Sequence, residues 1–443
     1  MCIARGPGSF GSHNSGVRLQ DRMQNIIGSE NGLKQGSFRN GLSANLAEAF
    51  QNIMRHCDVL ALGETVHTSD GYYESKISIL KNLIENKLLS CVAFENPWSD
   101  SKKMSEFVDG GEIDIHSAAA GLLNVWQSTK IIDFLIWLRN ENFPRPINER
   151  VVFFGFDIQR AEYSGDCVRK FALTHLSKEK AALLDPSSGS LLVRLNDKGL
   201  LPTWLAVKEL LTTGHTEIEQ ALDELVEIIA EVESIRVNEA LDDFDLKLSC
   251  IALSYYLRFT FHFAVEAYRT GVSAPSTKQP MPTRGFELRD EGMSALFEAY
   301  RNQLEFQKVA VWAHNLHIIK NGDKIPSWNK KCLGSHFADR YAERFYSVAI
   351  VGYDVKINWP WVPGMTGPPI PHPENSVEHL LKINEIDQCF IDLRESNLFQ
   401  SHAGPYRINP ILEVEDLRSH FDGLIYLNES IGMTIFDPAA TVG

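Results

Sequence analysis

The sequence predicts an α/β fold in which a parallel or mostly parallel central sheet is flanked by helices, with a helical insertion forming a cap beside a cleft. Three observations predict this class: short apolar runs, amphipathic helical segments between these runs, and one long interval that contains only helical patterns. The chain has 443 residues, of which 44% are hydrophobic. This length allows about three domains by arithmetic, and one large α/β domain with an insertion fits it equally well.

Seven short apolar runs are the predicted strands. They are rich in Val, Ile and Phe, and they lack the alternation of apolar and polar residues that half-exposed strands show, so they are typical of strands buried on both faces. The runs cover residues 59–67, 90–98, 151–157, 308–317, 347–354, 389–393 and 423–427.

Helical patterns lie between these runs. Residues 42–56, 72–89 and 129–140 carry apolar side chains at intervals of three and four, which is the spacing of one face of an α-helix. Strands and helices therefore alternate along the chain. This order predicts a parallel sheet covered by helices.

The alternation stops between about residues 162 and 283. Apolar side chains at 218, 222, 225, 229 and 232 follow helical spacing, and acidic side chains occupy the opposite face, as expected of a helix that faces solvent. Residues 246–268 are apolar nearly all round, which indicates a buried helix. We therefore divide the chain into a flexible leader (1–40), a first part of the α/β core (41–160), a helical insertion or cap (161–283) and a second part of the core (284–443).

Composition excludes several classes of protein. Lys and Arg number 43 against 57 Asp and Glu, a net charge of −14, so no general basic field attracts nucleic acid. No apolar run reaches the roughly 18 residues of a membrane-spanning helix, and the N-terminus lacks the pattern of a secretory signal. The seven cysteines are scattered without CxxC spacing, which argues against disulfides and zinc-thiolate sites. We expect a cytoplasmic monomer or homodimer that acts on a small molecule.

Ionisable or amide side chains follow four of the predicted strands. In open α/β sheets ligands bind outside the carboxyl ends of the strands. Any one such residue is more often a helix cap or a buried structural group, and this applies most to Asp157, but four together favour a functional site. The residues are Glu64, His67, Glu95, Asp157, His314, Asn315 and His317.

These same residues carry a resemblance to a known family. The motifs are Gly63-Glu64-Thr65-Val66-His67, Glu95 at the end of the next strand, Gly155-Phe156-Asp157, Arg289-Asp290 with Met293, and Trp312-Ala313-His314-Asn315-Leu316-His317. A following Gly334-Ser335-His336 and the run 347–353 also fit. In this order, over residues 58–353, the chain resembles the erythromycin esterase family.

The resemblance implies a metal-independent hydrolase of macrolide lactones and related esters that needs no cofactor. It implies that His67 is the general base that activates water and that Glu64 orients it. Glu95, His314, His317 and Arg289 match further active-site positions of the family. These roles are chemically reasonable, because imidazole titrates near a pKa of about 6.5 and a cationic side chain can stabilise an oxyanion.

The sequence departs from the family pattern close to His67. Thr68 and Ser69 follow the histidine where the family usually has Gly-Thr, and Gly71 stands where Glu is common. Lys76 replaces a typical Arg, and Lys cannot form a bidentate contact. These changes leave the predicted base intact and alter its surroundings. We also predict that three residues bind substrate: Lys76, Asp157 and Asn315.

Several interpretations of the site remain open. The first is hydrolysis of an ester or lactone of a small molecule, such as a natural-product intermediate or an antibiotic. The second is condensation, cyclisation or elimination with the same base, and the third is a non-catalytic binding protein. A metal site built from the histidines and glutamates is a further alternative, although their spacing matches no HExxH motif. No GxSxG, GxGxxG or P-loop motif supports serine-hydrolase or nucleotide chemistry.

Overall fold

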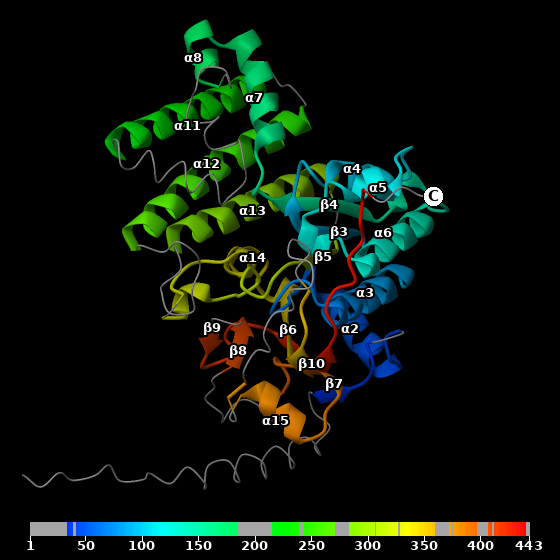
Figure 1. Ribbon diagram of the computed structural model, residues 1–443. Coiled ribbons are helices and arrows are strands. Elements are labelled where there is room, and N and C mark those ends of the chain that lie inside the picture. The colour runs from blue at the N-terminus through cyan, green and yellow to red at the C-terminus, as the bar shows by residue number, and fades with distance from the viewer. Residues whose placement is uncertain are drawn as a thin grey trace, which may run out of the picture.

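The computed structural model describes most of the chain, and its central feature is a sheet of eight strands in the order β1-β7-β10-β6-β2-β5-β3-β4. The described residues are 33–38, 41–184, 215–238, 243–270, 283–305, 307–326, 328–358, 372–373, 376–396, 406–409 and 412–439. Figure 1 shows helices on both sides of the sheet, and on one side a further group of helices lies outside helix α13 (Thr283–Leu304).

All seven predicted runs contain a strand of this sheet. The strands are β1 (Leu33–Gln35), β2 (Val59–Leu62), β3 (Cys91–Pro97), β4 (Val152–Asp157), β5 (Val309–Trp312), β6 (Phe345–Val355), β7 (Gln388–Asp392) and β10 (Gly423–Ser430). Seven of them run in the same direction, and β7 is reversed, pairing antiparallel with both β10 and β1. The predicted mostly parallel α/β fold is confirmed. A separate small sheet contains β8 (Tyr406–Asn409) and β9 (Leu412–Val414).

The predicted amphipathic helices are also present. The longer helices are α2 (Ala44–His56), α3 (Asp70–Glu85), α4 (Lys102–Val108), α6 (Thr129–Asn142), α7 (Glu162–His175), α11 (His215–Asn238), α12 (Phe244–Thr270), α13 (Thr283–Leu304), α14 (Leu333–Tyr341) and α15 (Val377–Ile383). The shorter ones are α5 (Ile115–Ala119) and α8 (Lys178–Leu183), together with the 3-10 turns at Asn124–Trp126, Ile147–Glu149, Gly322–Lys324 and Ala342–Arg344.

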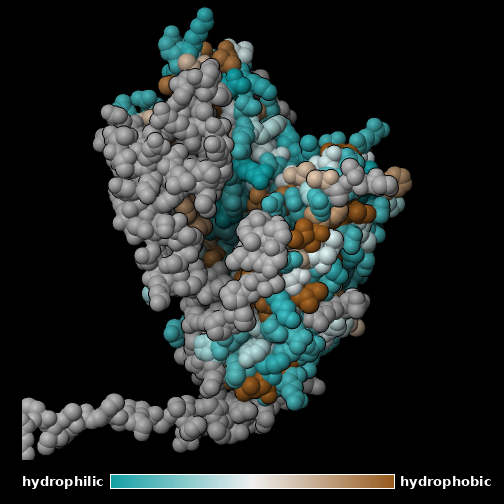
Figure 2. All heavy atoms as spheres, in the orientation of Figure 1, coloured by the Kyte–Doolittle hydropathy of each residue, from teal (hydrophilic) through white to brown (hydrophobic). Residues whose placement is uncertain are grey.

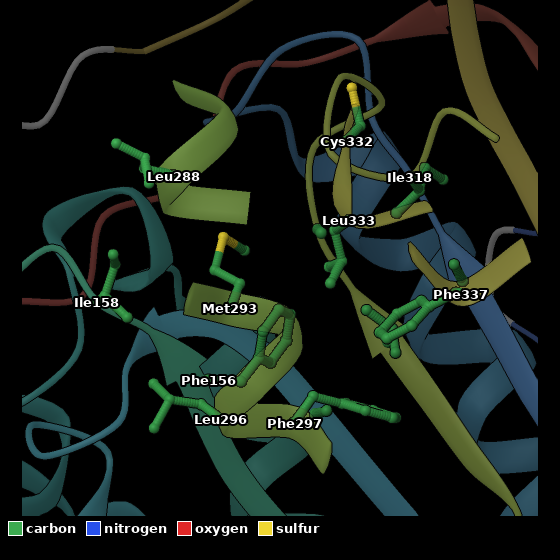
Figure 3. Close-up of a cluster of buried hydrophobic side chains, with 14 of the residues drawn as sticks. Phe156, Ile158, Leu288, Met293, Leu296, Phe297, Ile318, Cys332, Leu333 and Phe337 are labelled. Carbon is green, nitrogen blue, oxygen red and sulfur yellow. The ribbon is translucent and has the colours of Figure 1, made fainter. Parts of the chain in front are cut away.

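Two hydrophobic cores cover the two faces of the sheet. Along β2, Val59 and Ala61 pack in the core that contains α7 and α11 to α14, whereas Leu60 and Leu62 pack in the core with α2, α3 and α6. Since successive strand residues point to opposite faces, a strand covered on both sides must be apolar at every position. Figure 3 shows part of the first core, where the end of β4 packs against α13 and α14.

The helices α7, α8, α11 and α12 form a group at one end of the molecule, with α13 between them and the sheet (Figure 1). The predicted insertion ended at residue 283, but the helical packing continues, because α13 begins there and packs along α12. Within the predicted leader, Leu33–Gln35 pairs with β7, while residues 1–32 and 39–40 lie outside the described residues. None of the described helices is long and apolar enough to span a bilayer.

The segment that follows β10 crosses the N-terminal ends of α3 and α6. The backbone N–H of Met433 donates to the carbonyl of Thr68 at 2.8 Å, and the N–H and hydroxyl of Thr434 both donate to the Asp70 carboxylate. In Figure 1 this red segment continues toward α5. The C-terminus of the described chain is thereby fixed against the turn that follows β2.

Candidate active site

The carboxyl ends of four adjacent strands, β2, β5, β3 and β4, carry the predicted site residues. The ends of β2 and β5 approach closely because residue 63 is glycine: a Cβ there would lie 2.0 Å from Oδ1 of Asn315. The Asn315 side chain accepts a hydrogen bond from the N–H of Ile350 at 3.2 Å, and it donates one to the carbonyl of Ile350 at 3.0 Å. Asn315 therefore links β5 to β6 inside the protein.

His67 and Glu64 form a dyad at the end of β2. The distance from His67 Nδ1 to Glu64 Oε1 is 2.6 Å. Glu64 is fully buried, whereas the side chain of His67 is 24% exposed. Because the carboxylate accepts the Nδ1 proton, a neutral His67 has its lone pair on Nε2, where it can accept a proton.

Lys76 from α3 occupies the other side of Glu64. Its Nζ lies 2.8 Å from Glu64 Oε2 and 3.3 Å from the carbonyl of Ala313, and its side chain is completely buried. Burial lowers the pKa of Lys76, although Glu64 opposes this effect. The two oxygens of Glu64 thus bind different partners.

The turn after His67 is held in an unusual backbone conformation. Thr68 has a φ of 66°, in the left-handed region that favours glycine. Its N–H donates to the hydroxyl of Tyr73 at 2.8 Å, and that hydroxyl donates to the carbonyl of Val125 at 2.7 Å. Together with the Met433 contact, these bonds compensate the strain and fix the position of His67.

Two rings pack edge-on against the His67 imidazole. Trp126 lies at a centroid distance of 4.8 Å and His314 at 5.0 Å. The indole N–H of Trp126 donates to the carbonyl of Glu95 at 2.7 Å, so the ring is anchored to the neighbouring strand. Packing on both sides restricts the rotation of His67.

His314 is held as a neutral imidazole. Its Nε2 lies 2.8 Å from the carbonyl of Thr65, and its Nδ1 accepts the N–H of Leu316 at 3.1 Å. These partners assign the proton to Nε2. Burial, together with the nearby His67, lowers the pKa of His314 well below its usual value.

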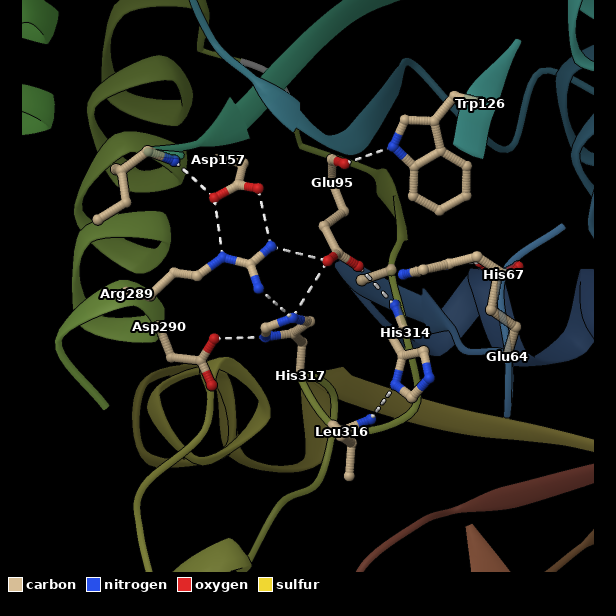
Figure 4. Close-up of polar contacts among 12 residues, drawn as sticks. Glu64, His67, Glu95, Trp126, Asp157, Arg289, Asp290, His314, Leu316 and His317 are labelled. Carbon is tan, nitrogen blue, oxygen red and sulfur yellow. Dashed lines mark hydrogen bonds and ion pairs between the residues drawn. The ribbon is translucent and has the colours of Figure 1, made fainter. Parts of the chain in front are cut away.

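A second cluster lies at the ends of β3 and β4, where Arg289 from α13 binds two carboxylates (Figure 4). Its guanidinium contacts Asp157 twice, at 3.1 and 2.8 Å, and Glu95 Oε1 at 2.9 Å. The Arg289 side chain is 7% exposed, and its carboxylate partners are at least as well buried. Burial opposes a charged guanidinium, but Asp157 and Glu95 outweigh it and raise the pKa of Arg289.

His317 completes this cluster as a cation. Its Nδ1 lies 2.5 Å from Asp290, and its Nε2 lies 3.1 Å from both Glu95 Oε1 and the Arg289 guanidinium. Burial would lower its pKa, but Asp290 and Glu95 outweigh burial and Arg289 together and raise the pKa to about 9. His314 and His317 therefore have opposite protonation states at neutral pH.

Glu95 connects the two clusters. One oxygen contacts Arg289 and His317, while the other accepts the backbone N–H of His314 at 2.7 Å. Burial would raise the pKa of Glu95, but His317 and Arg289 outweigh it and hold the pKa well below its usual range. In Figure 4 Glu95 lies between the arginine cluster and the side that carries His67.

The structure brings all six predicted catalytic residues together: Glu64, His67, Glu95, Arg289, His314 and His317. The three predicted substrate-binding residues, Lys76, Asp157 and Asn315, are instead fully buried, and each bonds to groups of the protein. Asp157 does not cap α7 either, since Ala161 occupies that position. These three side chains therefore have partners inside the protein, and their contact with substrate stays a prediction.

Two residues of the cluster were not predicted as site residues. Asp290, the partner of His317, belongs to the Arg289-Asp290 motif, and this adjacency to Arg289 was the available signal. Trp126 belongs to a 3-10 turn between two helices, and its contact with His67 depends on tertiary packing. Within the described parts of the chain, no group of three or more His, Cys, Asp or Glu side chains is arranged to hold a metal ion.

The fold and this cluster define an α/β protein with a buried network of histidine, arginine and carboxylate side chains at the carboxyl end of its sheet. The chain belongs to the erythromycin esterase family, whose sequence model matches residues 84–430. That range includes Glu95, Arg289, His314 and His317, and it begins after Glu64 and His67.

The chain is also similar to individual known proteins. The chain is 22% identical over 400 residues to "Putative hydrolase YbfO" of Bacillus subtilis (strain 168), which covers 85% of this chain and 84% of that protein. A variant of the erythromycin esterase EreC in its open conformation has a TM-score of 0.68 at 15% identity, over 91% of this chain and 99% of EreC. A succinoglycan biosynthesis protein has a TM-score of 0.71 at 14% identity, over 96% and 100% of the two chains. The two solved structures establish the fold.

Proposed function

We propose that this protein is a metal-independent hydrolase of carboxylic esters or lactones in small molecules, with His67 as the general base. The observation that carries this proposal is the dyad of His67 and Glu64. The carboxylate holds Nδ1 at 2.6 Å, which leaves Nε2 of a partly exposed imidazole as the proton acceptor. Membership of the erythromycin esterase family supports hydrolysis as the reaction class.

In the proposed reaction, Nε2 of His67 takes a proton from a water molecule as the water oxygen adds to the carbonyl carbon. Glu64 stabilises the imidazolium that forms. The tetrahedral intermediate then expels the alcohol oxygen, which receives the proton back from His67. The products are a carboxylic acid and an alcohol, or a single hydroxy acid when the substrate is a lactone.

The oxyanion of the intermediate requires positive charge nearby. Arg289 and protonated His317 are the cations of the second cluster, and Glu95 connects this cluster to the backbone of His314 beside His67. Their field would favour the intermediate over the neutral ester. The contacts to Asp157 and Asp290 keep both cations in fixed orientations.

The substrate class is also a proposal. The family and the fold of EreC make a macrolide lactone the first compound to test. Thr68, Gly71 and Lys76 differ from the family pattern, so natural-product esters outside the macrolides belong in the same panel. The visible face is hollowed near its middle, where hydrophilic and apolar side chains both reach the surface (Figure 2). We propose a cytoplasmic location and a monomer or homodimer.

The proposal is tested by His67→Ala with His336→Ala as a control, since His336 lies on α14 outside the cluster. His67→Ala should reduce turnover at least 1,000-fold, on the order expected for loss of a catalytic base, and the control should retain it. Turnover in ¹⁸O-labelled water should place one labelled oxygen in the acid product.

Other outcomes identify the alternatives. A product that carries no label, with turnover still dependent on His67, indicates condensation, cyclisation or elimination. A ligand that binds tightly and is recovered unchanged indicates a binding protein. Near-normal turnover by His67→Ala would remove His67 from the mechanism.

A further inference from the structure

Lys76 is a buried cation in direct contact with the proposed catalytic dyad. It lies on α3, six residues after the first residue of the helix, and its side chain has no exposed surface. Its Nζ binds Glu64 Oε2 at 2.8 Å and lies 4.6 Å from the centroid of the Trp312 ring. An ammonium group loses its hydration on burial and needs a partner of opposite charge.

The arrangement of Glu64 suggests what Lys76 contributes. Oε1 accepts from His67 at 2.6 Å and Oε2 accepts from Lys76 at 2.8 Å, so one carboxylate is held between two donors. With a single donor, the carboxylate could rotate about its last side-chain bond. With Lys76 in place, rotation breaks an ion pair in a buried environment.

We propose that Lys76 is a positioning residue for the reaction: its ammonium group fixes the Glu64 carboxylate in its contact with His67 and offsets part of the negative charge of that carboxylate. This inference rests on the proposed function, because it assigns Lys76 a role through His67. It gives Lys76 no contact with substrate or with the reacting atoms.

The charged groups around the dyad set the direction of the effect. Glu64 and Glu95 carry negative charge next to His67, and Lys76 is the cation on the opposite side of Glu64. His314 is neutral, and the buried phenols of Tyr72 and Tyr73 also face Glu64, with their pKa values raised by burial. When Lys76 loses its charge, Glu64 acts on His67 without its own cationic partner, whereas Glu95 stays paired with Arg289 and His317. His67 should then hold its proton to higher pH.

The experiment measures the pH dependence of kcat/KM for Lys76→Met, Lys76→Arg and the control Lys81→Met. Lys81 lies on the same helix, where its ammonium packs over Trp137, away from Glu64. Lys76→Met should move the acidic limb of the profile upward by about one pH unit and lower kcat by about tenfold with little change in KM. Lys76→Arg keeps the charge and should restore the limb, and Lys81→Met should match the unmodified protein.

The outcomes separate this inference from the proposed function. If His67→Ala abolishes turnover while folded Lys76→Met keeps the original acidic limb and kcat, the role of Lys76 is refuted and the base assignment stands. If His67→Ala retains turnover, the proposed function itself fails. If Lys76→Met and Lys76→Gln both fail to fold, Lys76 is a structural cross-link and the inference is wrong.

Discussion

Replacing Arg289 by Met tests whether the second cluster is an ion network that depends on its central cation. Methionine keeps a similar apolar length but removes all three guanidinium nitrogens. These nitrogens make two contacts with Asp157 and one with Glu95, at 2.8 to 3.1 Å. The variant therefore leaves two buried carboxylates without their shared partner.

The magnitude follows from burial. The Arg289 side chain is 7% exposed, and its partners Glu95 and Asp157 are 5% and 0% exposed. Removing one partner of a buried pair costs about 3–5 kcal/mol, because the remaining charge is desolvated without compensation. For comparison, the Arg284 side chain is 44% exposed where it pairs with Glu287 and Glu291, and such pairs contribute about 0–1 kcal/mol.

The assay is urea unfolding of Arg289→Met and the control Arg284→Met at a series of pH values. Glu95 has a lowered pKa in the folded protein, so its contribution to stability is present above its unfolded pKa of about 4.3 and is lost as pH falls through the folded value. The deficit of Arg289→Met should therefore be largest near neutral pH and smaller in acid.

Two results would refute this reasoning. One is a loss of stability in Arg289→Met no greater than that of Arg284→Met. The other is a deficit that does not change between neutral and acidic pH, which would mean that lost packing, and not unpaired charge, accounts for the effect.

Three further predictions concern the same region. The pKa of His317 is raised to about 9, so protonated His317 should stabilise the folded protein by on the order of 3 kcal/mol. This stabilisation should be present below about pH 6.5 and lost as pH rises through 9, and His317→Gln should flatten that part of the plot of unfolding free energy against pH. Gly63→Ala should cost about 1–3 kcal/mol by displacing Asn315, and Gly63→Ala/Asn315→Ala should be less destabilised than the sum of the single variants. Chelator-treated protein should keep its activity, and elemental analysis should find no stoichiometric metal.

Much of the fold followed from sequence patterns. The continuous apolar runs predicted strands covered on both faces, and β2 has this environment because alternate side chains enter different cores. The direction of β7 could not be predicted, since an apolar run is the same whether its neighbour is parallel or antiparallel. The sequence pattern could not show that α13 packs along α12, because helical spacing indicates a helix without indicating which helix lies next to it.

The candidate site was predicted as a set of residues, without their contacts. Parallel strands end at one edge, so Glu64, Glu95 and His314 were expected to be neighbours. Spacing along the chain could not show that Lys76 faces Glu64 and not a ligand, because that depends on how α3 packs against β2. Nor could it place Trp126 against His67.

The sequence by itself determined the order of the strands along the chain, the apolar character that buries them, and which ionisable residues follow them. These are local properties, set by the period of side chains and by the residue types at each strand end. Only the tertiary structure decided which residue pairs with which, and therefore which histidine is a cation. His314 and His317 are three residues apart, yet one meets a carbonyl and a backbone N–H while the other meets two carboxylates. Protonation depends on these neighbours, and the neighbours come from distant parts of the chain.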